Sequence, residues 1–412
     1  MLKRYFYSIL FAGLFPTLVA AQEPGPHEKA GEQQTLVERL THGKTSVENA
    51  EMNFQIFTTA NAEFHDREFE GANFKLNRVR MEIKGDVGKY LTYYYRQSFN
   101  KYMDPFSLDN LSSSLELACV NLNLSDRFSI TAGKHFLVLG GYEYYVNAIK
   151  VREFSEFNEM ISCYQAGLTA NWQITPTQEL CVQVMNNRSG SDDEIYQTGL
   201  PLGVESAKVP FFYSANWNSF YADGAIQLRY AASLAQVAQG YSAFYFTCGN
   251  IYERGPWIAY LDLMYTKQQL DQHGIISHLP AEPSMAPHTE YFTAIGNVDY
   301  RFHPRWNGYV KGAYETARVY KGSERFEKGR YRRSWNVQAC LEYFPFPKID
   351  LFVFGLYSFR GVALSDRAVA MGATAYDRHR ISLGLVYSIP VFCGLGKGRL
   401  KTSREKMTRN DK

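Results

Sequence analysis

Residues 164–174, Tyr-Gln-Ala-Gly-Leu-Thr-Ala-Asn-Trp-Gln-Ile, alternate apolar and polar side chains almost one for one. In a β-strand successive side chains point to opposite faces, so this stretch has one apolar face and one polar face. About sixteen segments of the chain share the alternation. Around a closed sheet, the apolar faces would contact lipid and the polar faces would enclose water. The pattern therefore predicts an all-β fold, a transmembrane antiparallel β-barrel of about 16 strands that forms a pore.

The predicted strands are long, and most of them are long enough for a tilted crossing of a bilayer. Short turns alternate with longer loops, with one exception near residues 235–239. Short turns on one side and long loops on the other are typical of an outer-membrane barrel. The strands are expected at residues 53–64, 73–84, 89–100, 114–124, 127–134, 161–174, 178–187, 209–218, 223–234, 240–250, 256–267, 289–302, 305–319, 330–345, 347–360 and 378–392. The longer loops are expected at residues 65–72, 101–113, 135–160, 188–208, 268–288, 320–329 and 361–377.

The start of the chain predicts secretion across the inner membrane, which together with the barrel pattern indicates the outer membrane of a Gram-negative bacterium. Lys3 and Arg4 precede an apolar core that ends in Val19-Ala20-Ala21, a small-residue cleavage site. The alternative, an uncleaved anchor, is disfavoured because the core is too short to span about 30 Å as a helix. The predicted organisation is a signal peptide at residues 1–21, a periplasmic leader at 22–50, the barrel at 51–393 and a basic tail at 394–412.

The composition agrees with a large sheet at a membrane interface. The chain has 30 Tyr, 28 Phe and 5 Trp, types that favour strands and membrane–water interfaces. Several lie beside predicted short turns, among them Trp257, Phe302 and Trp306, and we expect an aromatic girdle there. The alternative is that these rings pack a soluble core. The formal net charge of +3 is too balanced to indicate a nucleic-acid partner.

The cysteines indicate neither a metal site nor a redox motif. The six lie far apart and form no Cys-x-x-Cys pair or Cys/His cluster. We therefore expect no metal and no cofactor. The sequence by itself does not pair these cysteines, which are Cys119, Cys163, Cys181, Cys248, Cys340 and Cys393.

Charged residues occupy the polar face of several predicted strands. In the segment 75–84, Val79 and Met81 point toward lipid, so Arg78 and Arg80 point toward the lumen. A charge on the lipid face would cost about 2–4 kcal/mol at the midplane, so these charges are expected beside water. The alternative for any one of them is a position at a strand end, among lipid headgroups. The same alternation places Arg96, Arg229, Arg301, Lys311, Asp262, Asp299 and Glu315 on the inner face.

The longest predicted loop, residues 135–160, is rich in charge and is a candidate constriction. Folded into the barrel, it would narrow the channel and set an electric field against Arg78, Arg80 and Arg96. The alternative is that it lies over the rim of the barrel. Its charged residues are Glu143, Lys150, Arg152, Glu153, Glu156 and Glu159.

Two stretches resemble the bacterial phosphate-selective porins O and P. They are residues 74–85, Phe-Lys-Leu-Asn-Arg-Val-Arg-Met-Glu-Ile-Lys-Gly, followed by an Arg-bearing strand at Arg96, and residues 127–134, Arg-Phe-Ser-Ile-Thr-Ala-Gly-Lys. The resemblance implies a sixteen-stranded barrel, a homotrimer and a basic lumen that draws anions inward. This sequence has Val138-Leu139-Gly140 where the family usually has Pro-Phe-Gly, and the loop that follows is rich in Glu.

The leading hypothesis is an outer-membrane porin for passive diffusion of small hydrophilic solutes, with some preference for anions such as phosphate. Its partners would be membrane lipid and small ions or phosphate-like solutes, and it would not be an enzyme. One alternative is a barrel enzyme, although none of the nine histidines lies in a recognisable catalytic motif. Another is a secreted β-sandwich binding protein, which would stay soluble without detergent. The residues expected to line the pore and attract anions are Arg78, Arg80, Arg96, Lys134, Lys150, Arg152, Arg229, Arg301 and Lys311.

Overall fold

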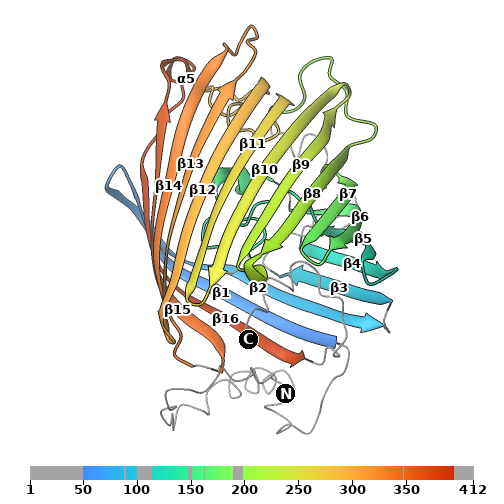
Figure 1. The fold of residues 1–412 in the computed structure, drawn as a ribbon. Coiled ribbons are helices and arrows are strands. Elements are labelled where there is room, and N and C mark those ends of the chain that lie inside the picture. Colours follow the sequence, from blue (N-terminus) through green and yellow to red (C-terminus); the bar gives the residue numbers. More distant parts are fainter. Residues whose placement is uncertain are drawn as a thin grey trace, which may run out of the picture. The chain divides into compact units, whose positions relative to one another are not determined.

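A computed structural model of the chain describes residues 50–87, 90–99, 114–146, 151–161, 163–188, 198–346 and 348–393. Within these ranges, sixteen antiparallel strands form one closed barrel, which confirms the predicted fold class (Figure 1). Each strand pairs with its neighbours in the sequence, and β1 closes the ring against β16. The strands are β1 (Ala50–His65), β2 (Glu68–Val87), β3 (Leu91–Ser98), β4 (Leu115–Asn123), β5 (Phe128–Phe136), β6 (Tyr164–Thr175), β7 (Gln178–Asn186), β8 (Phe211–Tyr221), β9 (Ile226–Ala238), β10 (Tyr241–Arg254), β11 (Trp257–Leu270), β12 (Pro287–His303), β13 (Trp306–Val319), β14 (Gly329–Tyr343), β15 (Asp350–Leu364) and β16 (Arg378–Cys393).

Among the described residues, three short helical turns accompany the strands: α3 (Glu156–Glu159), η1 (Ala222–Gly224) and α5 (Asp366–Ala370). In the described ranges, no helix has the length and apolar character needed to cross a membrane. The predicted signal peptide at residues 1–21, the leader at 22–50 and the tail at 394–412 lie outside the described residues, apart from Ala50, which begins β1.

The alternation in residues 164–174 gives β6 the reverse of the burial pattern that is usual in a soluble protein. In β6, Leu168 and Trp172 are 56% and 50% exposed, whereas Gln165 and Thr169 are 0% and 4% exposed. A soluble β-sandwich would bury the apolar positions and expose the polar ones. The polar face of β6 therefore points into the barrel, and its apolar face forms part of the outer surface.

The first hairpin corrects one predicted loop. Residues 65–72 are predicted to form a longer loop between two strands, but β1 ends at His65 and β2 begins at Glu68. The two residues between them, Asp66 and Arg67, have φ angles of 46° and 74°. Two successive positive φ values match the twist of the flanking strands, so the ladder continues to the tip of the hairpin.

Aromatic side chains lie at the strand ends beside the short turns, where the sequence predicts them. Trp257 stacks on Tyr300 with ring centroids 4.1 Å apart, and Trp306 lies 4.7 Å from Tyr343. All four belong to β11–β14, next to short connections. Rings with a polar edge are favoured at this depth because they contact both the apolar and the hydrated zone.

The outer face can be tested at Leu263, which lies near the middle of β11 and is exposed between Cys248 and Ala294 of the neighbouring strands. We expect Leu263→Arg to reduce the free energy of unfolding in lipid vesicles by about 2–4 kcal/mol, because the charge would face hydrocarbon. Urea-induced unfolding followed by tryptophan fluorescence measures this change. Leu263→Ile is the control and is expected to cost less than about 1.5 kcal/mol. Equal stability of the two variants would contradict a lipid-facing position.

Candidate functional site

The loop between β5 and β6 turns into the barrel, which confirms the inward folding considered for residues 135–160. The backbone N–H of Val138 donates to the side chain of Gln183 on β7 at 2.8 Å. The Ser214 hydroxyl on β8 donates to the Val138 carbonyl oxygen. Both partners are buried residues of the inner face, so the loop does not lie over the rim.

The first anchor of the loop is Asp262 on β11. Its carboxylate accepts the backbone N–H groups of Tyr142 and Glu143 at 2.7 and 2.8 Å. This contact needs a close approach of two backbones, because a Cβ atom at Gly249 would lie 2.6 Å from the Cα atom of Gly141. Gly141 itself has a φ of +73°, which favours glycine. Two glycines and one carboxylate thus fix where the loop meets the wall.

The second anchor is a buried ion pair between Glu143 and Lys311 of β13. The two charged atoms lie 2.5 Å apart, and Ser155 and Asn158 each donate to the same carboxylate at 2.6 Å. Burial alone would raise the pKa of Glu143, but the charge of Lys311 and these hydrogen bonds hold the pKa below its ordinary value. The carboxylate therefore stays ionised and ties both halves of the loop to β13.

The third anchor is Arg152. Its guanidinium lies 2.5 Å from Glu342 of β14 and is stacked against the rings of Phe352 and Phe354, at 5.1 and 4.5 Å from their centroids. Its side chain is only 1% exposed. Arg152 was expected to attract anions, but here its charge serves to hold the loop against the wall, because a buried guanidinium needs a carboxylate partner.

The fourth anchor is Glu153, which reaches β15 and β16. Arg378 and Arg380 each donate to its carboxylate at 2.6 Å, the Ser358 hydroxyl donates at 2.6 Å, and Arg360 lies at 3.4 Å. Burial alone would raise the pKa of Glu153, but Arg380, Ser358 and the other two arginines lower it.

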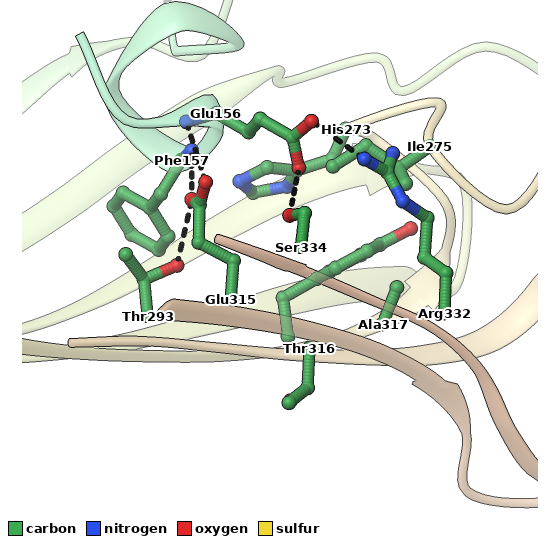
Figure 2. A pocket seen from close by; sticks show the side chains of 11 residues that line it. Glu156, Phe157, His273, Ile275, Thr293, Glu315, Thr316, Ala317, Arg332 and Ser334 are labelled. Atoms are coloured by element: carbon green, nitrogen blue, oxygen red, sulfur yellow. Dashed lines mark hydrogen bonds and ion pairs between the residues drawn. The ribbon is translucent and has the colours of Figure 1, made fainter. Parts of the chain in front are cut away.

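The short helix α3 follows these anchors and rests on β12–β14. Glu315 of β13 accepts the backbone N–H groups of Glu156 and Phe157, each at 3.2 Å. The Glu156 carboxylate accepts from Ser334 at 3.0 Å and from Arg332 at 2.7 Å. Figure 2 shows these residues around one pocket, together with Thr293, which donates to Glu315 at 3.2 Å.

One expectation about the loop was wrong. Its acids were expected to face Arg78, Arg80 and Arg96 across the channel. In the structure, Glu143, Glu153 and Glu156 instead form ion pairs with β13–β16. Burying a carboxylate is costly unless it is paired, so these acids bind the nearest cations on the wall that the loop contacts.

The predicted arginines of β2 and β3 form a separate cluster. Arg80 lies 2.8 Å from Glu116 of β4, and Arg96 lies 2.6 Å from Glu82. Arg78 is half-buried on the same inner face, and its Nη1 atom is buried without a hydrogen-bond partner. Among the described residues, this cluster therefore contains three guanidinium groups and two carboxylates.

The remaining predicted site residues are dispersed. Arg229 is buried on β9, with its guanidinium 3.2 Å from the centroid of the Tyr145 ring in the loop. Arg301 is exposed beside a short turn, 4.2 Å from the centroid of the Phe344 ring, and so lies away from the loop anchors. Lys134 is a buried residue of β5.

Lys150 lies outside the described residues. Several residues that bind the loop were absent from the predicted set, although their alternation with apolar neighbours in the last strands could have indicated them. They are Arg332, Glu342, Ser358, Arg360, Arg378 and Arg380.

Comparison with known proteins assigns this architecture to a family. The family model for phosphate-selective porins O and P matches residues 49–389, which includes nearly all of the barrel. The chain belongs to this porin family. No functionally curated protein matches the porin by sequence.

Solved structures with the same fold are also outer-membrane channels and proteins. The channel DcaP of Acinetobacter baumannii is 14% identical, with a TM-score of 0.56, and the match covers 84% of this porin and 99% of DcaP. OmpF of Salmonella typhi, solved in complex with daunomycin, is 11% identical, with a TM-score of 0.55 and coverage of 82% and 98%. OmpT of Vibrio cholerae is 9% identical, with a TM-score of 0.51 and coverage of 84% and 99%. Family and fold together are those of an outer-membrane channel for passive diffusion.

In this porin the inward loop contacts the wall beside Gly249, and its position can be tested there. We expect Gly249→Val to push the loop off Asp262, because the added side chain would overlap Gly141 at an overpacking cost of about 1–3 kcal/mol. Single-channel recordings in planar bilayers should then show noisier current and new sublevels. Gly296→Val is the control, since no atom lies within 4 Å of a Cβ at Gly296. A steady single-level current in Gly249→Val would show that the loop does not depend on this contact.

Proposed function

We propose that this porin lets small hydrophilic solutes diffuse across the outer membrane with a preference for anions such as phosphate. The observation that carries the proposal is the exposure of the charges around the loop. The side chains of Arg378 and Arg380 are 29% and 20% exposed, whereas Glu153, which they bind, is 5% exposed. At this position a solute therefore meets the guanidinium groups of Arg378 and Arg380 rather than the Glu153 carboxylate.

The cluster on β2 and β3 supports the same preference. Glu82 and Glu116 are engaged by Arg96 and Arg80, and Arg78 adds a third positive charge to the same inner face. Positive charge on the walls of a narrow, low-dielectric passage raises the local concentration of anions. Passage requires that each contact be favourable enough to admit the solute and weak enough to release it.

The preference can be tested at Arg78, whose removal breaks none of these ion pairs. We expect Arg78→Gln to lower anion preference, seen as a smaller reversal potential in a salt gradient across a planar bilayer. Arg333→Gln removes the same charge from the exposed outer face of β14 and is the control. It should leave the reversal potential unchanged, because outer-face charges are screened from the lumen. Identical reversal potentials for Arg78→Gln and the wild type would refute this role of Arg78.

We also infer that the porin is exported with a cleaved signal peptide and assembles as a homotrimer. Support for export comes from the small-residue site at Val19-Ala20-Ala21. Support for a trimer comes from the related fold of OmpT, one structure of which is described as a trimer form. Intact mass and chemical cross-linking of the protein purified from outer membranes check the two inferences.

A further inference from the structure

Four side chains on the inner face of β15 and β16 form a compact cluster of hydrogen-bond donors. In the register of these strands, Ser358 lies opposite Arg380 and Arg360 lies opposite Arg378. The Phe359–His379 pair lies between these two pairs, so all four side chains point to the same side of the sheet. We call Ser358, Arg360, Arg378 and Arg380 the arginine grid.

The arginine grid already holds one carboxylate, that of Glu153 from the inward loop. One carboxylate oxygen accepts from Arg378 at 2.6 Å and lies 3.4 Å from Arg360. The other oxygen accepts from Arg380 and from the Ser358 hydroxyl, both at 2.6 Å. Guanidinium groups bind carboxylate and phosphate oxygens through short charge-assisted bonds, so the grid has the chemistry of a site for either group.

The grid has more donors than Glu153 uses. Each guanidinium carries five N–H donors, and the Nε atoms of Arg360 and Arg380 are buried without a hydrogen-bond partner. Two other acids among the described residues form ion pairs with Arg360: Glu159 at 3.5 Å and Glu156 at 3.8 Å.

Glu63 and Glu156 also lie near the grid. Glu63 of β1 lies opposite Arg380 in the register of β1 and β16. Glu156 forms its shorter ion pair with Arg332, which lies outside the grid. Arg378 and Arg380 remain partly exposed while Glu153 is buried between them and the loop. A solute can therefore approach the grid from the side that Glu153 does not cover.

We propose that the arginine grid is a binding site for solutes that carry a carboxylate or phosphate group, and that Glu153 is an internal ligand which the solute displaces. This inference rests on the proposed anion preference and names the chemistry that the channel recognises. Displacement of Glu153 does not free the loop, because Asp262, Lys311 and Arg152 hold it independently.

Competition from Glu153 also explains how a solute that binds at this site can still pass through the channel. Three guanidinium groups would hold a doubly charged anion tightly and slow its release. When an internal ligand occupies a site for most of the time, the site binds a solute only while it is vacant. The apparent affinity for the solute is then the intrinsic affinity multiplied by the vacant fraction. Each solute then leaves as the Glu153 carboxylate returns, which satisfies the need for weak binding.

The test is a block of chloride current by added anions through the full chain in planar bilayers. Inorganic phosphate and succinate are titrated separately, and the concentration that halves the block-sensitive current gives the apparent affinity. Glu153→Gln removes the competing charge. We expect the apparent affinity for the added anion to rise by about tenfold, because the internal ligand loses about the free energy of one charge-assisted hydrogen bond to the grid. Glu159→Gln removes the same charge from the same loop without vacating Arg378 and Arg380, and should change affinity by less than about twofold.

Two further variants keep the test decisive if Glu153→Gln disturbs the loop. Glu153→Asp retains the charge but shortens its reach, so its apparent affinity should lie between those of the wild type and Glu153→Gln. Adding Arg380→Gln to Glu153→Gln should remove the gain, because the solute loses a donor of the grid. A gain with succinate alone, with phosphate alone or with both supports the site and identifies its ligand.

Equal apparent affinity in the wild type, Glu153→Asp and Glu153→Gln would overturn the proposal. If the reversal potential still showed anion preference, only the proposal for the arginine grid would fail, and the proposed function would stand. If the wild type showed no anion preference, the proposed function would fail as well.

Discussion

The structure depends on one constraint: inside a bilayer, every backbone N–H and C=O group must find a partner within the protein. A β-strand satisfies its own groups only through its neighbours, so a sheet that spans lipid must close. Closure is completed where β1 pairs with β16, along a ladder that runs from Glu51↔Cys393 to His65↔Arg378. The alternation of side chains follows from the same geometry, because each strand presents one face to lipid and one to the lumen.

Closure creates an interior that the loop after β5 partly fills. Inside the barrel the loop packs apolar side chains such as Leu139 and Phe157 against Met185 and Met264 of the wall. Charged groups also hold it: Asp262 binds two backbone N–H groups, Lys311 pairs with Glu143, and Glu342 pairs with Arg152. Such pairs fix position more than they add stability, because their attraction is largely offset by the cost of removing them from water.

This use of charge separates two roles that look alike in the sequence. Arg152 and Lys311 are buried in ion pairs that hold the loop. Arg378 and Arg380 also bind a loop carboxylate, but their side chains remain partly exposed. Glu-rich composition of the loop would favour cations if its acids were free. Because they are paired, the same composition is compatible with a lumen that attracts anions.

The sequence alone determined the barrel, the number of its strands and the inward direction of residues such as Arg78, Arg80 and Lys311. These follow from a period of two that is local and repeats along the chain. It failed at the Asp66-Arg67 turn, which was predicted to lie within a longer loop, because turn geometry depends on φ angles that composition does not encode. Only the tertiary structure decided which carboxylate meets which cation. Glu153 and Arg378 are separated by more than half of the chain, and they meet because closure of the barrel brings β16 beside the path of the loop.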